Sequence, residues 1–182
     1  MKHTKVQKTA LPADSRITLT LPGADFADSY RFASARPEAC ALTQFLALFA
    51  RTPGWMNLMM DLRNRVVGYV GLKNLGGMAL RDPAKPAAAY KVGERVGIFT
   101  LQYADEREVI LEDRDKHLQV QLSLFRLGAD ELQLSTVVHI HNRLGRVYMA
   151  VVGPVHGLIV PLMLKQAQEQ VQEQAQEQAG HV

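Results

Sequence analysis

The stretch HLQVQLSLFRLGADELQLSTVVHIH, residues 117–141, decides the fold that we expect for this chain. Apolar and polar residues alternate on both sides of the central GAD, residues 128–130. Because successive side chains of a strand point to opposite faces, the alternation predicts two strands with one apolar face each. A three-residue loop makes them a hairpin and brings both apolar faces to the same side of the sheet. The expected register pairs Leu127 with Glu131, Gln119 with His139 and His117 with His141.

Further strands are expected before this hairpin. Residues 26–32 predict a first strand or extended edge, and GIFTLQYA (97–104) with REVILE (107–112) predicts a second hairpin. Between them, residues 71–91 hold two prolines and a glycine pair, which predicts a loop.

Two helices are expected near the N-terminus. The first runs from Pro37 to Phe49, with apolar residues at helical spacing. The second follows RTPGW, where Thr52 is the expected N-cap and Pro53 the first helical residue. Its apolar stripe is expected to consist of Trp55, Met59, Leu62 and Val66.

The last helix is expected to begin at the N-cap Asn142 and to continue into QAQEQVQEQAQEQA, fraying towards Gly180. Residues 147–164 are apolar and nearly as long as the roughly 20 residues that cross a bilayer. Pro154 and Pro161 interrupt this segment and predict kinks. The pattern favours a buried core helix over an integral membrane span.

The order of these elements predicts an α+β fold, because the apolar face of an antiparallel sheet has to be covered. We expect a helix-grip architecture: a curved antiparallel sheet wrapped around the long C-terminal helix, with two further helices near the N-terminus and a cavity between. The expected divisions are an N-terminal arm at 1–24, the domain at 25–166, and a Gln/Glu-rich helical or frayed tail at 167–182.

The composition narrows the classes of function. The 182 residues are 47% hydrophobic and 21% charged, which is typical of one soluble domain. A net charge of +3 without a dense Lys/Arg patch speaks against nucleic acid as a partner. Cys40, the one cysteine, indicates a small buried residue in a reducing compartment rather than a nucleophile. The N-terminus lacks the apolar core of a signal peptide, so we expect a cytoplasmic protein.

Three stretches carry a resemblance to a known family: WMNLMMDLRNRVVGYVGLK (55–73), DKHL (115–118) and TVVHIHNRLGRVYMAVVGPVHGLIV (136–160). Together they resemble an uncharacterised bacterial family of the START-like superfamily (SRPBCC, polyketide-cyclase) over roughly residues 32–165. The resemblance implies a helix-grip fold and a small-molecule cavity, with no assigned reaction.

Some members of that family are similar domains fused to nicotinamide-dependent reductases. Here no GxGxxG motif follows a strand, so a reductase would be a separate protein. The sequence also departs from the family pattern at Gln119 and Val120, where an acidic residue and an aromatic one are usual. This departure puts a charge-dependent role at that position in doubt.

Three histidines share one face of the predicted hairpin and allow three interpretations. His139 and His141 lie two apart on one strand, and His117 faces them from the other, an arrangement that suits zinc with an open water position. The polar neighbours Gln119, Gln121, Gln133 and Ser135 favour a solvated face instead. In a third arrangement the sheet is inverted, and the polar face lines the cavity. We expect no metal and no other cofactor.

Three functions remain open. The first is non-catalytic binding of a small apolar molecule, in a cavity lined by Trp55, Met59, Leu62, Phe99, Leu122, Val138, Tyr148 and Val152. The second is a cyclase, hydratase or isomerase in which Tyr148, His156 or a strand histidine such as His117 transfers a proton. The third is an accessory role, in which the last helix and its tail dock on a separate reductase. A homodimer is the other possible partner arrangement.

Overall fold

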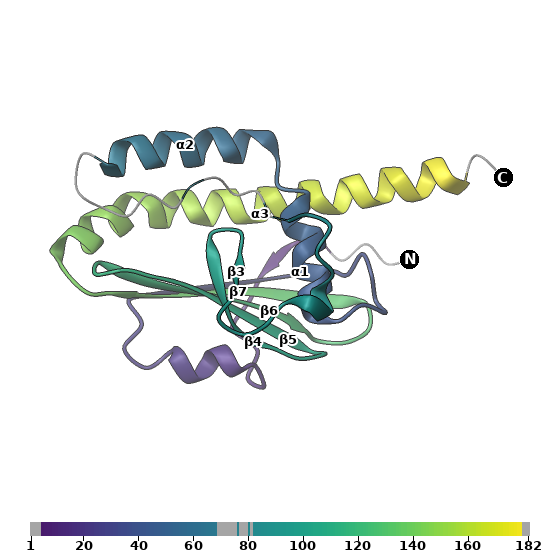
Figure 1. Ribbon diagram of the computed structural model, residues 1–182, viewed down its shortest axis with the longest axis horizontal. Coiled ribbons are helices and arrows are strands. Elements are labelled where there is room, and N and C mark those ends of the chain that lie inside the picture. Colours follow the sequence, from purple (N-terminus) through teal and green to yellow (C-terminus); the bar gives the residue numbers. More distant parts are fainter. Residues whose placement is uncertain (1–4, 69–75, 77–79, 81, 180–182) are drawn as a thin grey trace.

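Seven strands form an antiparallel sheet in the computed structural model, which describes residues 5–68, 76, 80 and 82–179. Their order across the sheet is β1-β2-β7-β6-β5-β4-β3 (Figure 1). The strands are β1 (Gln7–Lys8), β2 (Phe26–Ala33), β3 (Arg95–Val96), β4 (Phe99–Ala104), β5 (Glu108–Arg114), β6 (Leu118–Arg126) and β7 (Glu131–Ile140).

The central hairpin of β6 and β7 has the predicted register, with Gln119 opposite His139. The other expected partners are joined by backbone hydrogen bonds, from Leu127 N to the Glu131 carbonyl at 3.0 Å and from His141 N to the His117 carbonyl at 2.8 Å. The predicted register is therefore confirmed. Its physical reason is that the three-residue loop and the alternation of side chains bring the apolar faces of both strands to the same side.

The helices are α1 (Ala41–Ala50), α2 (Gly54–Gly68) and α3 (Arg143–Ala179), with short 3-10 helices η1 (Arg16–Thr20) and η2 (Ala87–Ala89). The long helix α3 extends along one face of the sheet, and α2 runs beside it, farther from the sheet (Figure 1). At one end of this pair the Trp55 indole donates to Gln166 at 3.1 Å, and at the other the Arg63 guanidinium donates to the Tyr148 hydroxyl at 3.2 Å. The predicted α+β class is confirmed.

The first two helices begin later than the sequence predicts. Residues 36–39 form a turn, closed by a hydrogen bond from Ala39 N to the Arg36 carbonyl at 3.0 Å, and α1 begins only at Ala41. Thr52 does not cap α2. Its hydroxyl donates instead to the Phe49 carbonyl at 2.6 Å, so this side chain closes α1. A threonine between two helices can bond to either one, and the carbonyls ending α1 need donors.

Asn142 caps α3 as predicted, because its Oδ1 accepts the backbone N–H of Gly145 at 3.1 Å. The close approach of this helix end to the sheet requires a glycine. A Cβ on Gly145 would lie 2.6 Å from the His117 carbonyl oxygen and 2.9 Å from Ile140 Cγ2. The N-terminal turn of α3 is therefore packed directly on the end of the β6–β7 hairpin.

The inner face of the sheet, toward α3, carries the main hydrophobic core. Its side chains meet α1 and α3, and the buried members of this core include Phe32, Phe45, Leu101, Leu111, Leu124, Leu132, Leu134, Val160 and Leu164. Phe45 stacks on Phe49 at 5.4 Å, and Phe49 meets Phe99 edge-on at 6.5 Å between ring centroids. The alternation in the sequence thus identified the face that α3 covers.

The outer face is polar but buried, which corrects the expectation of a solvated surface. Gln121, Ser123, Gln133 and Ser135 are at most 8% exposed. The segment before β2, with η1, crosses this face (Figure 1). Its Ile17 side chain is fully buried. The Gln133 amide donates to the Ala10 carbonyl at 2.6 Å. These residues are polar because they bond to one another and to the covering segment, not because water reaches them.

Up to Gln170, only one face of α3 is buried. An 18-residue window within Arg143–Gln170 has a mean hydropathy of 1.9, yet only 11% of that window is buried, and Val147, Val151, Leu158 and Leu162 are more than half exposed. By length and composition this helix could cross a membrane, which is weak evidence for a span. The helix continues through Pro154 and Pro161. The prediction of a buried core helix therefore holds for one face alone.

Two predictions fall partly outside the described residues. They concern part of the loop at 71–91, including the family-like Gly71, Leu72 and Lys73, and the last residues of the tail from Gly180.

Candidate functional site

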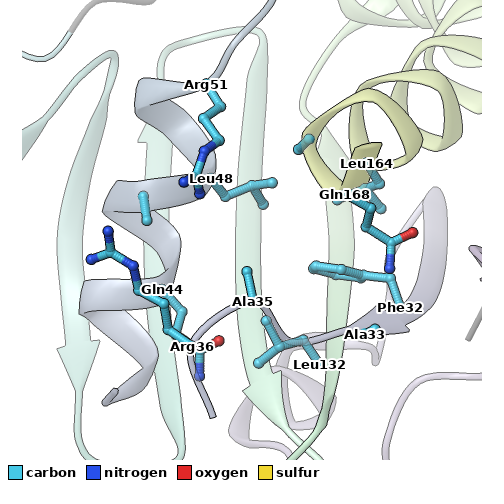
Figure 2. Close-up of a pocket in the computed structure, with 12 residues that line it drawn as sticks. Phe32, Ala33, Ala35, Arg36, Gln44, Leu48, Arg51, Leu132, Leu164 and Gln168 are labelled. Carbon is cyan, nitrogen blue, oxygen red and sulfur yellow. The ribbon is translucent and has the colours of Figure 1, made fainter. Parts of the chain in front are cut away.

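A groove opens between α1, the C-terminal half of α3 and the inner face of the sheet (Figure 2). Its floor contains Phe32 of β2, Leu132 of β7 and Leu164 of α3, none more than 4% exposed. Ala47 and Leu48 of α1 line the facing wall, and Leu48 points across the groove toward α3. The groove is therefore an apolar opening between the sheet and its C-terminal helix.

Polar side chains surround this apolar floor, namely Arg36, Gln44, Arg51 and Gln168. The Gln44 amide is fixed, since it accepts from the Ser34 hydroxyl at 2.5 Å and donates to the Ala39 carbonyl at 3.1 Å. The groove encloses about 40 Å³, far less than the roughly 300 Å³ of a small ligand pocket. A ligand of ordinary size has to move α1 and α3 apart.

The eight predicted lining residues lie elsewhere. Phe99 and Val138 are buried, Leu122 and Val152 are half-buried, Trp55 and Tyr148 join α2 to α3, and Met59 and Leu62 are 39% and 61% exposed. None of them lines the groove.

The face of α2 that packs on the core differs from the predicted apolar stripe. Met56 and Met60 contact the core, whereas Met59 and Leu62 of the predicted stripe are exposed. The apolar residues of this helix form one broad arc, with Asn57, Asp61 and Asn64 on the remaining side, and Leu58 within the arc is 71% exposed. Because the arc is wider than the face that packs, the sequence does not reveal which part of it contacts the core.

A buried polar cluster lies deeper in the interface between the sheet and α3. Asp28 of β2 is 3% exposed, and its Oδ1 is 3.4 Å from His156 Nε2. The same ring nitrogen is 3.3 Å from the Thr136 hydroxyl, and the ring meets Phe26 edge-on at 5.8 Å. Among the described residues, neither carboxylate oxygen of Asp28 has a donor in good hydrogen-bond geometry. A carboxylate so buried needs a cation or a proton, and His156 can supply one.

Tyr30 joins the cluster from the next inward-facing position of β2. Burial, followed by the negative charge of Asp28, raises the pKa of Tyr30 to about 12. The hydroxyl therefore keeps its proton at neutral pH and can serve only as a neutral donor or acceptor there. Tyr148, by contrast, lies beside α2, with the Arg63 guanidinium 5.4 Å from its ring.

The three strand histidines do not converge. His117 is 8% exposed, and its Nδ1 accepts from the Asn142 amide at 2.9 Å. His139 is half-buried, and His141 is exposed with its Nδ1 3.3 Å from the Asp115 carbonyl. Across the part of the chain that the structure describes, no three His, Cys, Asp or Glu side chains are placed to hold a metal ion.

Sequence reasoning missed Asp28, although the sequence holds a signal for it. In FADSYRF, Asp28 has the same parity as Phe26, Tyr30 and Phe32, so it is a charge on the apolar face of a strand. The groove offered no such signal, because its residues come from α1, α3, two strands and the turn at Ala35 and Arg36.

The fold and the groove define an α+β protein whose antiparallel sheet is covered by a long C-terminal helix. The chain belongs to a family of proteins of unknown function, DUF2867, whose family model matches residues 20–163. The match extends from the end of η1 into α3 and includes the Asp28 cluster. No curated protein and no solved structure matches the chain.

Proposed function

We propose that this protein binds a small, largely apolar molecule between α1, α3 and the inner face of the sheet. The observation that carries the proposal is the groove, where Phe32, Leu132 and Leu164 form an apolar floor under an opening. Apolar floors with a few polar groups at the margin are typical of small-molecule sites. The resemblance to START-like proteins, which implies a cavity at this interface, points the same way.

Binding requires α1 and α3 to separate, since the groove is small as it stands. The ligand would replace contacts between apolar side chains with contacts of its own, so the apolar area leaving water stabilises the complex. The side chains of Gln44 and Arg36 at the margin would orient a polar end of the ligand.

The test uses native mass spectrometry for co-purified ligand and Trp55 fluorescence for added ligand. The Trp55 indole bonds to Gln166, which lies on α3 between the groove residues Leu164 and Gln168, so movement of α3 should change its emission. Fatty acids, quinones and aromatic polyketides form the panel. We expect saturable binding of at least one class, and no response across the panel at high concentration would contradict the proposal.

A matched pair of variants locates the site. Ala47→Phe fills the groove, whereas Ala50→Phe adds the same ring to an exposed position three residues along the same helix. We expect Ala47→Phe to weaken binding at least tenfold and Ala50→Phe to leave it unchanged. Equal affinities in the two variants would place the ligand elsewhere.

A second candidate function, proton transfer by a cyclase, hydratase or isomerase, is favoured by the Asp28–His156 pair. A carboxylate 3.4 Å from an imidazole can orient the ring and stabilise its protonated form. His156 retains access to solvent, with 24% of its side chain exposed. This function would be supported if the protein converts a compound of the panel and if His156→Gln abolishes that turnover while Trp55 fluorescence still reports binding. Turnover unaffected by His156→Gln would exclude it.

A further inference from the structure

A second cavity lies on the opposite face of the sheet, under the N-terminal segment. It is open to solvent on one side and holds about 370 Å³, within the usual range for small-molecule sites. One wall is the segment Thr9–Asp14, and the others come from Arg31 of β2, Arg107 before β5, and the β6–β7 hairpin. None of these residues belongs to the groove between α1 and α3.

The walls of this cavity are fixed by hydrogen bonds. Thr9 N donates to the Ser29 carbonyl at 2.9 Å, and the Gln133 amide donates to the Ala10 carbonyl at 2.6 Å. Beyond the cavity, Arg16 N donates to Glu108 at 2.8 Å. A preformed cavity loses little conformational entropy when it binds a ligand.

Two arginines provide the positive charge of the cavity. The Arg31 guanidinium makes only a loose ion pair, 3.8 Å from Glu131, and its buried Nε has no hydrogen-bond partner among the described residues. The Arg107 guanidinium lies 5.1 Å from the ring of Phe125, which orients it without using its donors. One carboxylate, Asp14, also lines the cavity, so two positive charges and one negative charge give a lining charge of about +1.

We propose that this cavity binds a small organic carboxylate. The guanidinium fork matches a carboxylate in geometry and charge. The exposed lining is mainly polar, and the smaller apolar part, at Leu11, Pro12, Phe125 and Leu127, can contact a short carbon skeleton, which a bare inorganic ion lacks. The negative charge of Asp14 would repel a second negative charge on the ligand, so a monoanion is favoured over a dianion.

The experiment is isothermal titration with benzoate and 3-phenylpropionate, beside benzamide and inorganic phosphate. Benzamide has nearly the shape of benzoate without its charge, and phosphate has the charge without the apolar body. We expect a carboxylate to bind, benzamide to bind at least tenfold more weakly because charge-assisted hydrogen bonds are lost, and phosphate to bind more weakly as well. Equal binding of benzoate and benzamide, or tighter binding of phosphate, would overturn the proposal.

Variants assign the binding to this cavity. Arg107→Gln should weaken benzoate about tenfold or more, whereas Arg114→Gln, a change of the same charge at an exposed end of β5, should not. Asp14→Asn should strengthen binding, and a gain of affinity cannot come from misfolding. Ala47→Phe should leave benzoate unaffected, which separates this cavity from the groove of the proposed function. Unchanged affinity in both Arg107→Gln and Asp14→Asn would refute the assignment.

Discussion

Each face of the sheet buries one carboxylate, and the two are held in opposite ways. Glu108 on the outer face and Asp28 on the inner face are both 3% exposed. Glu108 accepts hydrogen bonds from the Ser15 hydroxyl at 2.5 Å, the Ser123 hydroxyl at 2.6 Å and the Arg16 backbone at 2.8 Å. Among the described residues, Asp28 has no donor in good hydrogen-bond geometry, although His156 lies 3.4 Å away and Tyr30 interacts with it from the same strand.

The difference shows that equal burial does not imply an equal role. A buried carboxylate with several donors stabilises the elements that supply them, and here Glu108 joins the N-terminal segment to the sheet. A buried carboxylate without donors costs free energy in the folded state, and sites that retain such groups are often functional. The predictions that follow test this contrast.

The largest effect is expected at Glu108. Glu108→Ala leaves two buried hydroxyls and one backbone N–H without their acceptor, so we expect a loss of about 3–5 kcal/mol in the free energy of unfolding. Urea denaturation measures this loss. The control Glu106→Ala, at an exposed position two residues away, should change the free energy by no more than about 0.5 kcal/mol. Similar losses in both variants would show that the hydrogen bonds contribute little.

The next effect concerns Tyr30 on the inner face. Its pKa is raised to about 12 in the folded protein, against 10 for an unperturbed tyrosine. The folded state therefore holds this proton more tightly, and its contribution to stability is complete below pH 10 and lost as the pH rises to about 12. Two pKa units correspond to about 2–3 kcal/mol. Denaturation at pH 9 and pH 12 should show a smaller decline in Tyr30→Phe than in the wild type. Identical declines would refute the prediction.

A smaller loss in the free energy of unfolding is expected for Gly145→Ala, where α3 contacts the open end of the β6–β7 hairpin, at His117 and Ile140. A methyl group there would lie 2.6 Å from a backbone oxygen, and overpacking of this kind costs about 1–3 kcal/mol. The matched control is Gly153→Ala in the same helix, where an added Cβ meets nothing within 4 Å. That change should stabilise the protein by up to about 1 kcal/mol, since alanine favours the helix. Thermal melts distinguish these opposite signs.

The smallest effect is expected at Asp28. Asp28→Asn removes a buried charge that lacks donors while keeping its shape, so we expect a change within about 1 kcal/mol, or a gain in stability. This outcome would contrast with Glu108→Ala at equal burial. A loss above about 3 kcal/mol would mean that the ion pair with His156 is structural.

The sequence predicted the parts of the fold that depend on local pattern. Alternation and loop length fixed the register of β6 and β7, and the preference for Asn at an N-cap located the start of α3. It misjudged the outer face, because the polar side chains of Gln133 and Ser135 suggest water whereas they bond to a covering segment and to a neighbouring strand. Which segment covers which face is decided by contacts distant in sequence, and no pattern within a strand records them.

The residues of the candidate site were harder to predict from the sequence than the register of the strands, again because they come together from distant parts of the chain. The predicted lining was derived from one stripe of α2, but the apolar arc of that helix is broad, and Met56 and Met60 are the residues in it that pack on the core. His156 was identified as a candidate, whereas its partner Asp28 lies 128 positions earlier in the chain. Only the pairing of β2 with β7 brings Asp28 opposite Thr136 and under α3.

The glycine contact at the start of α3 also gives the helix a mechanical character. Gly145 lies directly against the sheet, and this contact is the pivot about which a rigid helix would tilt. Ala167 at the groove lies 22 residues further along α3, which is about 33 Å at 1.5 Å per residue. With this leverage, a tilt of about 5° at the pivot displaces the helix by about 3 Å at the groove. A rigid tilt about this contact would therefore change the width of the groove much more than it would shift the cap formed by Asn142.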